Sequence, residues 1–231
     1  MKKQNITSVK VKKSKKNKYI SLGIWIEKMR EAFTNAFLPE IYPTMLTVGY
    51  DEAKLNALKT KLAELISLDG LQISAHGEQV GATDASSKKR KEINGLYLMH
   101  RSLLKILLGE NTLASVSMKL TGQRKKSYGE WFQNVSSFYT QLTQNPELAA
   151  HAASVGITST VIDAQTQLLA DLQTLKETQR TKTANARMAT KVRDKAFVEL
   201  RSQYAEYIKY ARILLAGNQM LEAIGIVVRA K

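Results

Sequence analysis

The sequence contains no cysteine and only three prolines among its 231 residues. The absence of cysteine excludes disulfide scaffolds, thiolate metal sites and cysteine nucleophiles. Proline is the strongest helix breaker, and this chain is rich in alanine, leucine, lysine, glutamine and glutamate, which all favour helices. We therefore expect an all-α fold.

Long apolar runs are also missing. No stretch approaches the length of about 18 apolar residues that marks a membrane span. Residues 20–26 are apolar, but Glu27 and Lys28 follow directly and no small-residue cleavage site appears, so a secretory signal is not indicated. A mitochondrial presequence would favour arginine, and residues 1–18 contain none. We expect a cytoplasmic protein without a membrane span.

Acidic residues are absent from residues 1–18, which hold eight of the 35 basic residues and so more than half of the net charge of +15. A segment so charged and so poor in large apolar side chains cannot form a core, so residues 1–19 are predicted to be a basic, flexible arm. Two interpretations stay open, an arm that binds a partner and a solubilising tail. The lysines of the arm are Lys2, Lys3, Lys10, Lys12, Lys13, Lys15, Lys16 and Lys18.

The chain aligns with itself when it is shifted by 107 positions, which pairs residues 39–118 with 146–225 without a gap. Identical pairs, including two prolines, are far more frequent than the roughly one in sixteen that chance would produce. A shift of 106 positions pairs Trp25 with Trp131. Low-complexity similarity between helices would not align both prolines and both tryptophans, so duplication is the better interpretation.

The duplication predicts two tandem pseudo-repeats of a helical unit, at residues 20–120 and 128–231, joined by a basic linker at 121–127. We expect the repeats to pack as an antiparallel helical bundle. Each repeat opens with a short amphipathic helix, at about 22–37 and 128–143, which ends before a proline.

A second and a third helix follow in each repeat, with leucines recurring at spacings of three and four. The predicted core includes Leu65, Leu107, Leu172 and Leu214. Asparagine, aspartate or threonine at helix starts and glycine at helix ends are typical caps. The predicted caps are Asp51, Gly109 and Asn111 in the first repeat, and Thr158, Gly217 and Asn218 in the second.

The repeats differ between the second and third helices. Residues 69–87 contain three glycines and several serines, which predicts a flexible loop. The equivalent residues 176–194 contain neither glycine nor proline, but their would-be core positions are polar. A helical hairpin with a polar tip is favoured there over one continuous helix, which stays open as the alternative.

Motifs that carry chemistry are absent. None of the three histidines, His76, His100 and His151, has a partner at metal-ligand spacing, and no Glu-x-x-His motif occurs. A phosphate-binding glycine loop and a serine nucleophile elbow are missing as well. We expect no catalytic residue, no metal site and no cofactor, and we interpret Trp25 and Trp131 as packing residues.

Two smaller basic clusters could extend the charge of the arm, although both could also be plain solvated helix ends. Since lysine and arginine near phosphates release counterions, the predicted partner is nucleic acid or another polyanion. No helix-turn-helix or RNA-binding signature accompanies them, so such binding would be non-specific. The predicted polyanion-binding residues outside the arm are Lys88, Lys89, Arg90, Lys91, Arg124, Lys125 and Lys126.

The charge pattern and the absence of catalytic motifs together favour a non-enzymatic structural or adaptor protein. Its arm would dock on a polyanion-containing assembly or on neighbouring subunits, in a homo-oligomer or a larger assembly. One alternative is a stand-alone, non-specific nucleic-acid-binding protein. Another is an enzyme or ligand-binding protein that uses the interior of the bundle.

Overall fold

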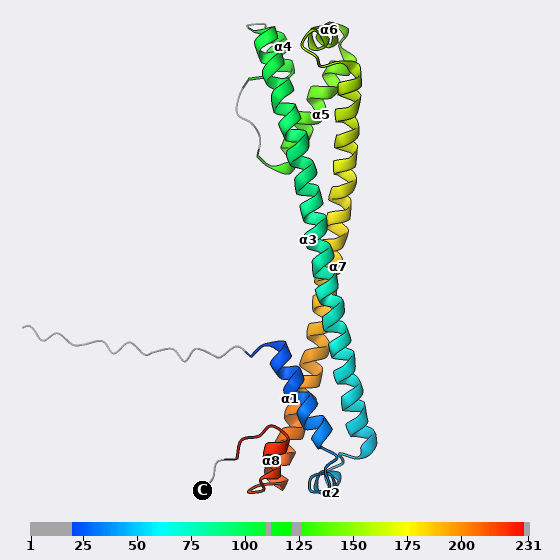
Figure 1. Ribbon diagram of the computed structural model, residues 1–231, viewed down its shortest axis with the longest axis vertical. Coiled ribbons are helices and arrows are strands. Elements are labelled where there is room, and N and C mark those ends of the chain that lie inside the picture. The colour runs from blue at the N-terminus through cyan, green and yellow to red at the C-terminus, as the bar shows by residue number, and fades with distance from the viewer. Residues whose placement is uncertain (1–19, 110–111, 122–125, 229–231) are drawn as a thin grey trace, which may run out of the picture. The chain divides into compact units, whose positions relative to one another are not determined.

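The computed structural model describes residues 20–109, 112–121 and 126–228 (Figure 1). Throughout these ranges the regular secondary structure is helical and contains no strand, which confirms the predicted all-α class. The predicted arm with its eight lysines, together with Arg124 and Lys125, lies outside the described residues.

The described residues form two long helices and several short ones (Figure 1). None of these helices is long and apolar enough to cross a membrane. In chain order they are α1 (Leu22–Asn35), α2 (Tyr42–Leu46), α3 (Glu52–Leu108), α4 (Thr112–Ser117), α5 (Tyr128–Gln144), α6 (Pro146–Ser154), α7 (Ser159–Leu214) and α8 (Met220–Ala223).

Local capping explains where the short helices begin. The side chains of Ser21 and Ser127 accept hydrogen bonds from the backbone amides of Ile24 (3.5 Å) and Glu130 (3.4 Å) at the starts of α1 and α5. The Asn145 side chain accepts from two amides at the start of α6. These bonds satisfy donors that have no partner inside a helix, so the cap residues set the starting points.

Several predicted caps of the long helices are confirmed. The backbone amide of Lys54 donates to the Asp51 carboxylate (2.7 Å) at the start of α3. Gly109 and Gly217, which follow α3 and α7, adopt positive φ angles of 48° and 81°. The N-cap position of α8 is Gln219 and not the predicted Asn218, although the Asn218 side chain accepts from Met220 N (3.0 Å) directly before that helix; Asn111 lies outside the described residues.

Residues 69–87, predicted as a flexible loop, are helical, because α3 continues through them without a break. The prediction was wrong. The glycines that suggested the loop, Gly70, Gly77 and Gly81, are solvent-exposed. The absence of a side chain at these positions therefore costs no contact in the core. Each glycine costs about 1 kcal/mol relative to alanine, and the contacts of α3 with α7 offset this cost.

Residues 176–194 are part of α7, a single helix, so the favoured hairpin was also wrong. The polar side chains that suggested a hairpin tip contact polar side chains of α3 instead. Because these groups satisfy one another, polar side chains can line the contact between the two helices here. The pairs are Gln179 with Thr83 (3.1 Å), Lys182 with Glu78 (2.7 Å), and Arg193 with Gln72 (2.8 Å) and Asp69 (3.3 Å).

The chain divides into two compact units, each with its own core. Among the described residues, unit 1 is formed by residues 20–67 and 195–228, and unit 2 lies within Leu68–Asp194. In unit 1, α1, α2 and α8 pack on the first part of α3 and the last part of α7 (Figure 1). In unit 2, α5 and α6 pack on the last part of α3 and the first part of α7.

Two of the four predicted leucine core positions are confirmed. Leu65 and Leu172 are fully buried. Leu107 and Leu214 are 39% and 38% exposed, so their assignment to the core was wrong. The buried positions at these helix ends are instead Leu104 and Leu108 in α3, and Ala211 and Leu215 at the end of α7. A step of one residue turns a helical side chain by about 100°, which carries it from the buried to the exposed face.

Candidate anion-binding pocket

A pocket of about 940 Å³ opens in unit 2 among α3, α5 and the connection that precedes α5. Among the described residues, the charged side chains that line it are all basic, and no carboxylate faces it. These cations are Arg90, Lys91 and Arg101 from α3, and Lys119 and Lys126 from the connection between α4 and α5.

Helical spacing places the α3 side of the pocket. Arg90, Asn94, Tyr97 and Arg101 follow one another at steps of four, three and four residues, so they share one face of α3. Lys91 lies beside this face and is exposed. The last part of α3 thereby presents a row of polar side chains to one cavity.

Two arginines fasten the connection before α5 to α3. Arg101 donates from Nη2 to the carbonyl oxygen of Leu120 (2.6 Å) and from Nε to that of Lys119 (3.3 Å). Arg90 donates from Nη2 to the carbonyl oxygen of Lys126 (3.1 Å). A guanidinium has five N–H donors, so each arginine keeps donors beyond those used in these bonds.

The remaining wall of the pocket is held by hydrogen bonds between side chains. Trp131 donates from Nε1 to Asn94 Oδ1 (2.9 Å), and Lys119 Nζ donates to Asn134 Oδ1 (3.0 Å). Trp131 is only 6% exposed, and the Arg90 guanidinium lies 4.8 Å from its ring centroid. The indole is therefore a buried wall covered by a cation, and it is not an open surface for stacking.

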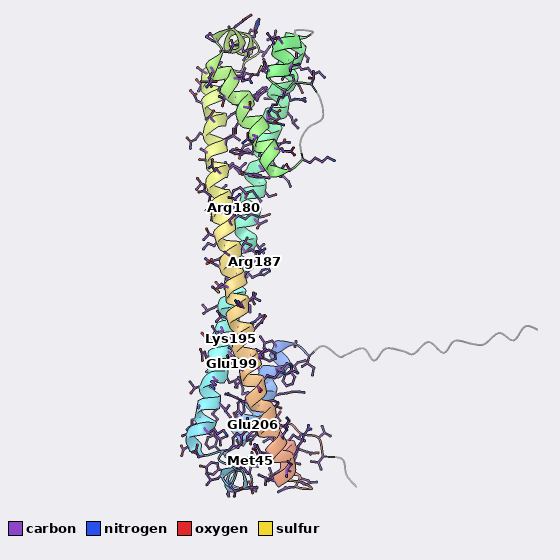
Figure 2. The ribbon with its side chains drawn as sticks, turned by 180° about the vertical axis from the view of Figure 1, so that it is seen from behind. Met45, Arg180, Arg187, Lys195, Glu199 and Glu206 are labelled. Atoms are coloured by element: carbon purple, nitrogen blue, oxygen red, sulfur yellow. The ribbon has the colours of Figure 1, made fainter. Side chains whose placement is uncertain are left out.

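Positive charge accumulates beside the pocket. The pKa of Lys176 is lowered, first by burial and then by repulsion from Arg90 and Arg180. Arg180 is labelled on α7 in Figure 2. Burial raises the pKa of Tyr128, while the same two arginines oppose that shift. Both shifts include a contribution from neighbouring cations, as expected where positive charges lie close together.

The structure brings together only some of the predicted polyanion-binding residues. Arg90, Lys91 and Lys126, which are far apart in sequence, line the same pocket. Lys88 and Lys89 instead form local ion pairs with acidic residues of α3, at 3.2 Å and 3.1 Å. The predicted arm lysines, Arg124 and Lys125 lie outside the described residues.

Sequence reasoning missed Arg101 and Lys119. Arg101 lies eleven residues after Arg90, and both follow the predicted loop at 69–87, so their shared helical face was a usable signal in the sequence. Lys119 is an isolated lysine, and only its bond to Asn134 reveals its place in the pocket.

His100 and the two tryptophans are packed within the described part of the chain, whereas His76 and His151 are exposed. His100 is buried and its Nδ1 lies 2.9 Å from Tyr139 Oη. Trp25 packs against Phe197 and Tyr204 in unit 1, which agrees with the predicted packing role. Across the described residues, no three histidine or acidic side chains are grouped so that they could hold a metal ion.

Comparison of the chain with protein-family profiles, with curated proteins and with solved structures gave no match. The function is therefore inferred from the pocket and from the distribution of charge.

Proposed function

We propose that this protein is a non-enzymatic structural or adaptor protein that docks on a polyanion-containing or multi-subunit assembly. The observation that supports it is the pocket of unit 2, where five cations surround about 940 Å³ and no carboxylate occurs among its lining residues. The cations of the pocket repel one another at close range. An anion that enters the pocket relieves this repulsion and is attracted by several cations at once.

The arm adds to this attraction in the proposal. Its eight lysines carry more than half of the net charge, and no acidic residue interrupts them. Each lysine placed near a phosphate releases condensed counterions, which favours binding at low salt. Arm and pocket then act on the same kind of partner, the arm by non-specific attraction and the pocket through placed donors.

The proposed architecture is a duplicated helical unit that forms an antiparallel bundle. Shifting α3 by 107 positions moves Glu52–Leu108 onto residues 159–215, and α7 covers Ser159–Leu214. Along the polar pairs between α3 and α7 in unit 2, residue numbers rise in one helix as they fall in the other. Each unit would then combine the opening helices of one repeat with the far end of the other repeat's long helix.

A stand-alone, non-specific nucleic-acid-binding protein is the second candidate function. The covered indole of Trp131 favours contacts to phosphates over contacts to bases, as non-specific binding requires. The two candidates differ in assembly, because an adaptor forms oligomers or larger complexes, and a stand-alone binding protein does not. A cytoplasmic location remains a prediction from the sequence under either candidate.

Deletion of residues 1–18 tests the proposal. The deletion leaves the core residues of the described chain in place, so the helical circular dichroism signal should persist. Affinity for a fluorescent oligonucleotide should fall strongly, and the log–log salt slope should drop by about 0.9 per lost duplex contact, or about 0.7 for a single strand. Titrations at about 50 and about 200 mM salt measure this slope.

Light scattering on the same two proteins separates the candidates. A change in oligomer size on deletion supports docking of the arm on neighbouring subunits. A monomer in both cases, with salt-dependent oligonucleotide binding, supports the nucleic-acid candidate. Unchanged assembly together with unchanged oligonucleotide binding would show that the arm is a solubilising tail, and the arm-docking proposal would be wrong.

A further inference from the structure

We infer that the pocket of unit 2 is a site for a compact anion that carries two or more phosphoryl groups, recognised by charge and not by an attached base. The inference rests on the proposed polyanion-binding function and assigns a ligand class to its pocket. Its support comes from the orientation of the polar donors, the volume and spread of charge, the covered aromatic wall, and the residues at the equivalent positions of the other repeat.

The asparagines of the pocket are oriented to donate. Asn94 uses its Oδ1 to accept from Trp131, and Asn134 uses its Oδ1 to accept from Lys119. In both side chains the acceptor end is thus engaged within the protein, and the Nδ2 end, with two N–H donors, is not used in these bonds. Phosphoryl oxygens are acceptors, so they match a pocket that combines amide donors with ammonium and guanidinium groups.

The size of the pocket and the spread of its cations favour more than one phosphoryl group. A volume of about 940 Å³ is at the upper end of the range of about 300–1,000 Å³ typical of small-molecule sites. The cations are divided between α3, with Arg90, Lys91 and Arg101, and the connection before α5, with Lys119 and Lys126. A chain of phosphoryl groups can contact the cations on both sides at once. A single orthophosphate reaches fewer of them.

The aromatic residues of the pocket do not offer a platform for a base. Trp131 and Tyr97 are each 6% exposed, and Arg90 covers the indole. Stacking of a base requires an open aromatic face. Affinity should therefore depend on the number of phosphoryl groups and should change little when a nucleoside is attached.

A cation of the second repeat, Arg201, likewise covers a tryptophan, at 4.6 Å from the Trp25 ring centroid, but this repeat has apolar residues at the positions of three pocket cations. At a shift of 107 positions, Arg90, Lys91 and Arg101 of α3 correspond to Phe197, Val198 and Ile208 of α7. In unit 1, Phe197 packs against Trp25, with ring centroids 6.3 Å apart, and Ile208 is part of the buried core. In the second repeat, apolar residues thus occupy the positions that hold cations in the first repeat.

A bound anion would also link two parts of unit 2. Arg101 and Arg90 already attach the connection before α5 to α3 through its carbonyl oxygens. An anion held by Lys91 on one side and Lys126 on the other adds a second connection between the same segments. Binding to the folded unit stabilises it by RT ln(1 + L/Kd), where L is the concentration of the free anion, so its unfolding temperature should rise with that concentration.

Titration calorimetry of the full-length protein with inorganic orthophosphate, pyrophosphate, tripolyphosphate and ATP tests the inference, without added divalent cations. We expect tripolyphosphate to bind at least about tenfold more tightly than orthophosphate, since each additional charge-assisted hydrogen bond is worth about a factor of ten or more. ATP should bind within about threefold of tripolyphosphate, given the absence of an open aromatic face.

A pair of charge-matched variants locates the binding. Lys91→Gln/Lys126→Gln removes two exposed pocket cations, and Lys88→Gln/Lys105→Gln removes two exposed cations of α3 that do not line the pocket. Both keep the arm, so non-specific binding to it is the same in each. The first variant should weaken tripolyphosphate binding about tenfold or more, and the second should leave it within about twofold. Circular dichroism confirms that both remain folded.

Three outcomes would overturn the inference: no binding of tripolyphosphate, equal losses in the two variants, or binding of ATP without binding of tripolyphosphate. Oligonucleotide titrations with the same variants distinguish failure of this inference from failure of the proposed function. If the pocket variant weakens oligonucleotide binding while tripolyphosphate does not bind, the proposed function stands and the ligand class is wrong. If tripolyphosphate binds at the pocket lysines but no oligonucleotide or assembly does, the ligand class stands and the docking function is wrong.

Discussion

Truncation of two leucines that lie one turn apart in α3 measures which face of the helix is buried. Leu104 is fully buried in the core of unit 2, whereas Leu107 is 39% exposed. Leu104→Ala should cost about 2–5 kcal/mol, because it removes buried methyl groups and leaves a cavity. Leu107→Ala should cost about 1 kcal/mol, since a partly exposed side chain loses less transfer energy and leaves no enclosed cavity.

Both substitutions replace leucine by alanine in the same helix, so the change in helix propensity is common to them. Their difference therefore isolates burial. For a unit of this size, a loss of about 3 kcal/mol lowers the melting temperature by about 10 °C, at about 2.1 cal/mol/K per residue. Thermal unfolding followed by circular dichroism measures this shift. Equal losses for the two variants, or a larger loss for Leu107→Ala, would refute the assigned orientation of α3.

The other predictions concern the continuity of α3 and a buried histidine. Gly77→Ala should stabilise the protein by about 0.5–1 kcal/mol in thermal unfolding, because Gly77 is helical and a Cβ there meets nothing within 4 Å. Gly49→Ala, at a φ of 80°, should destabilise it by about 1–2 kcal/mol, and the same sign for both variants would contradict the structure. Burial lowers the pKa of His100, so the unfolded chain binds its proton more readily, and stability should fall as pH drops below the ordinary histidine value of 6.5. Urea unfolding at several pH values should show a smaller acid-induced loss in His100→Gln, and an unchanged loss would exclude His100 as its source.

Much of the helical plan was predictable from local sequence. Ser21 and Ser127 show where helices begin, and Gly109 and Gly217 show where the long helices end, because capping depends on residues within one turn of the helix end. Leu65 was also assigned correctly, since the spacing of its neighbouring leucines is unambiguous.

Where the sequence led to wrong predictions, the deciding contacts were distant in the chain. Residues 69–87 have glycines and 176–194 have polar core positions, and each segment alone indicates a break in a helix. The pairing of Arg193 with Asp69 and of Lys182 with Glu78 joins residues more than a hundred positions apart. Local propensity contains no information about such partners.

The features of the candidate site can likewise be separated into those that the sequence determines and those that the tertiary structure decides. The sequence alone determined the all-α class and the presence of basic clusters, because composition, helical periodicity and charge are properties of the chain itself. Only the tertiary structure decided which cations share a pocket. It brought Lys126 to Arg90, placed Arg101 and Lys119 beside them, and left Lys88 in a local ion pair. The physical reason is that a binding site is defined by proximity in space, and proximity depends on how long helices pack, which no local pattern of residues specifies.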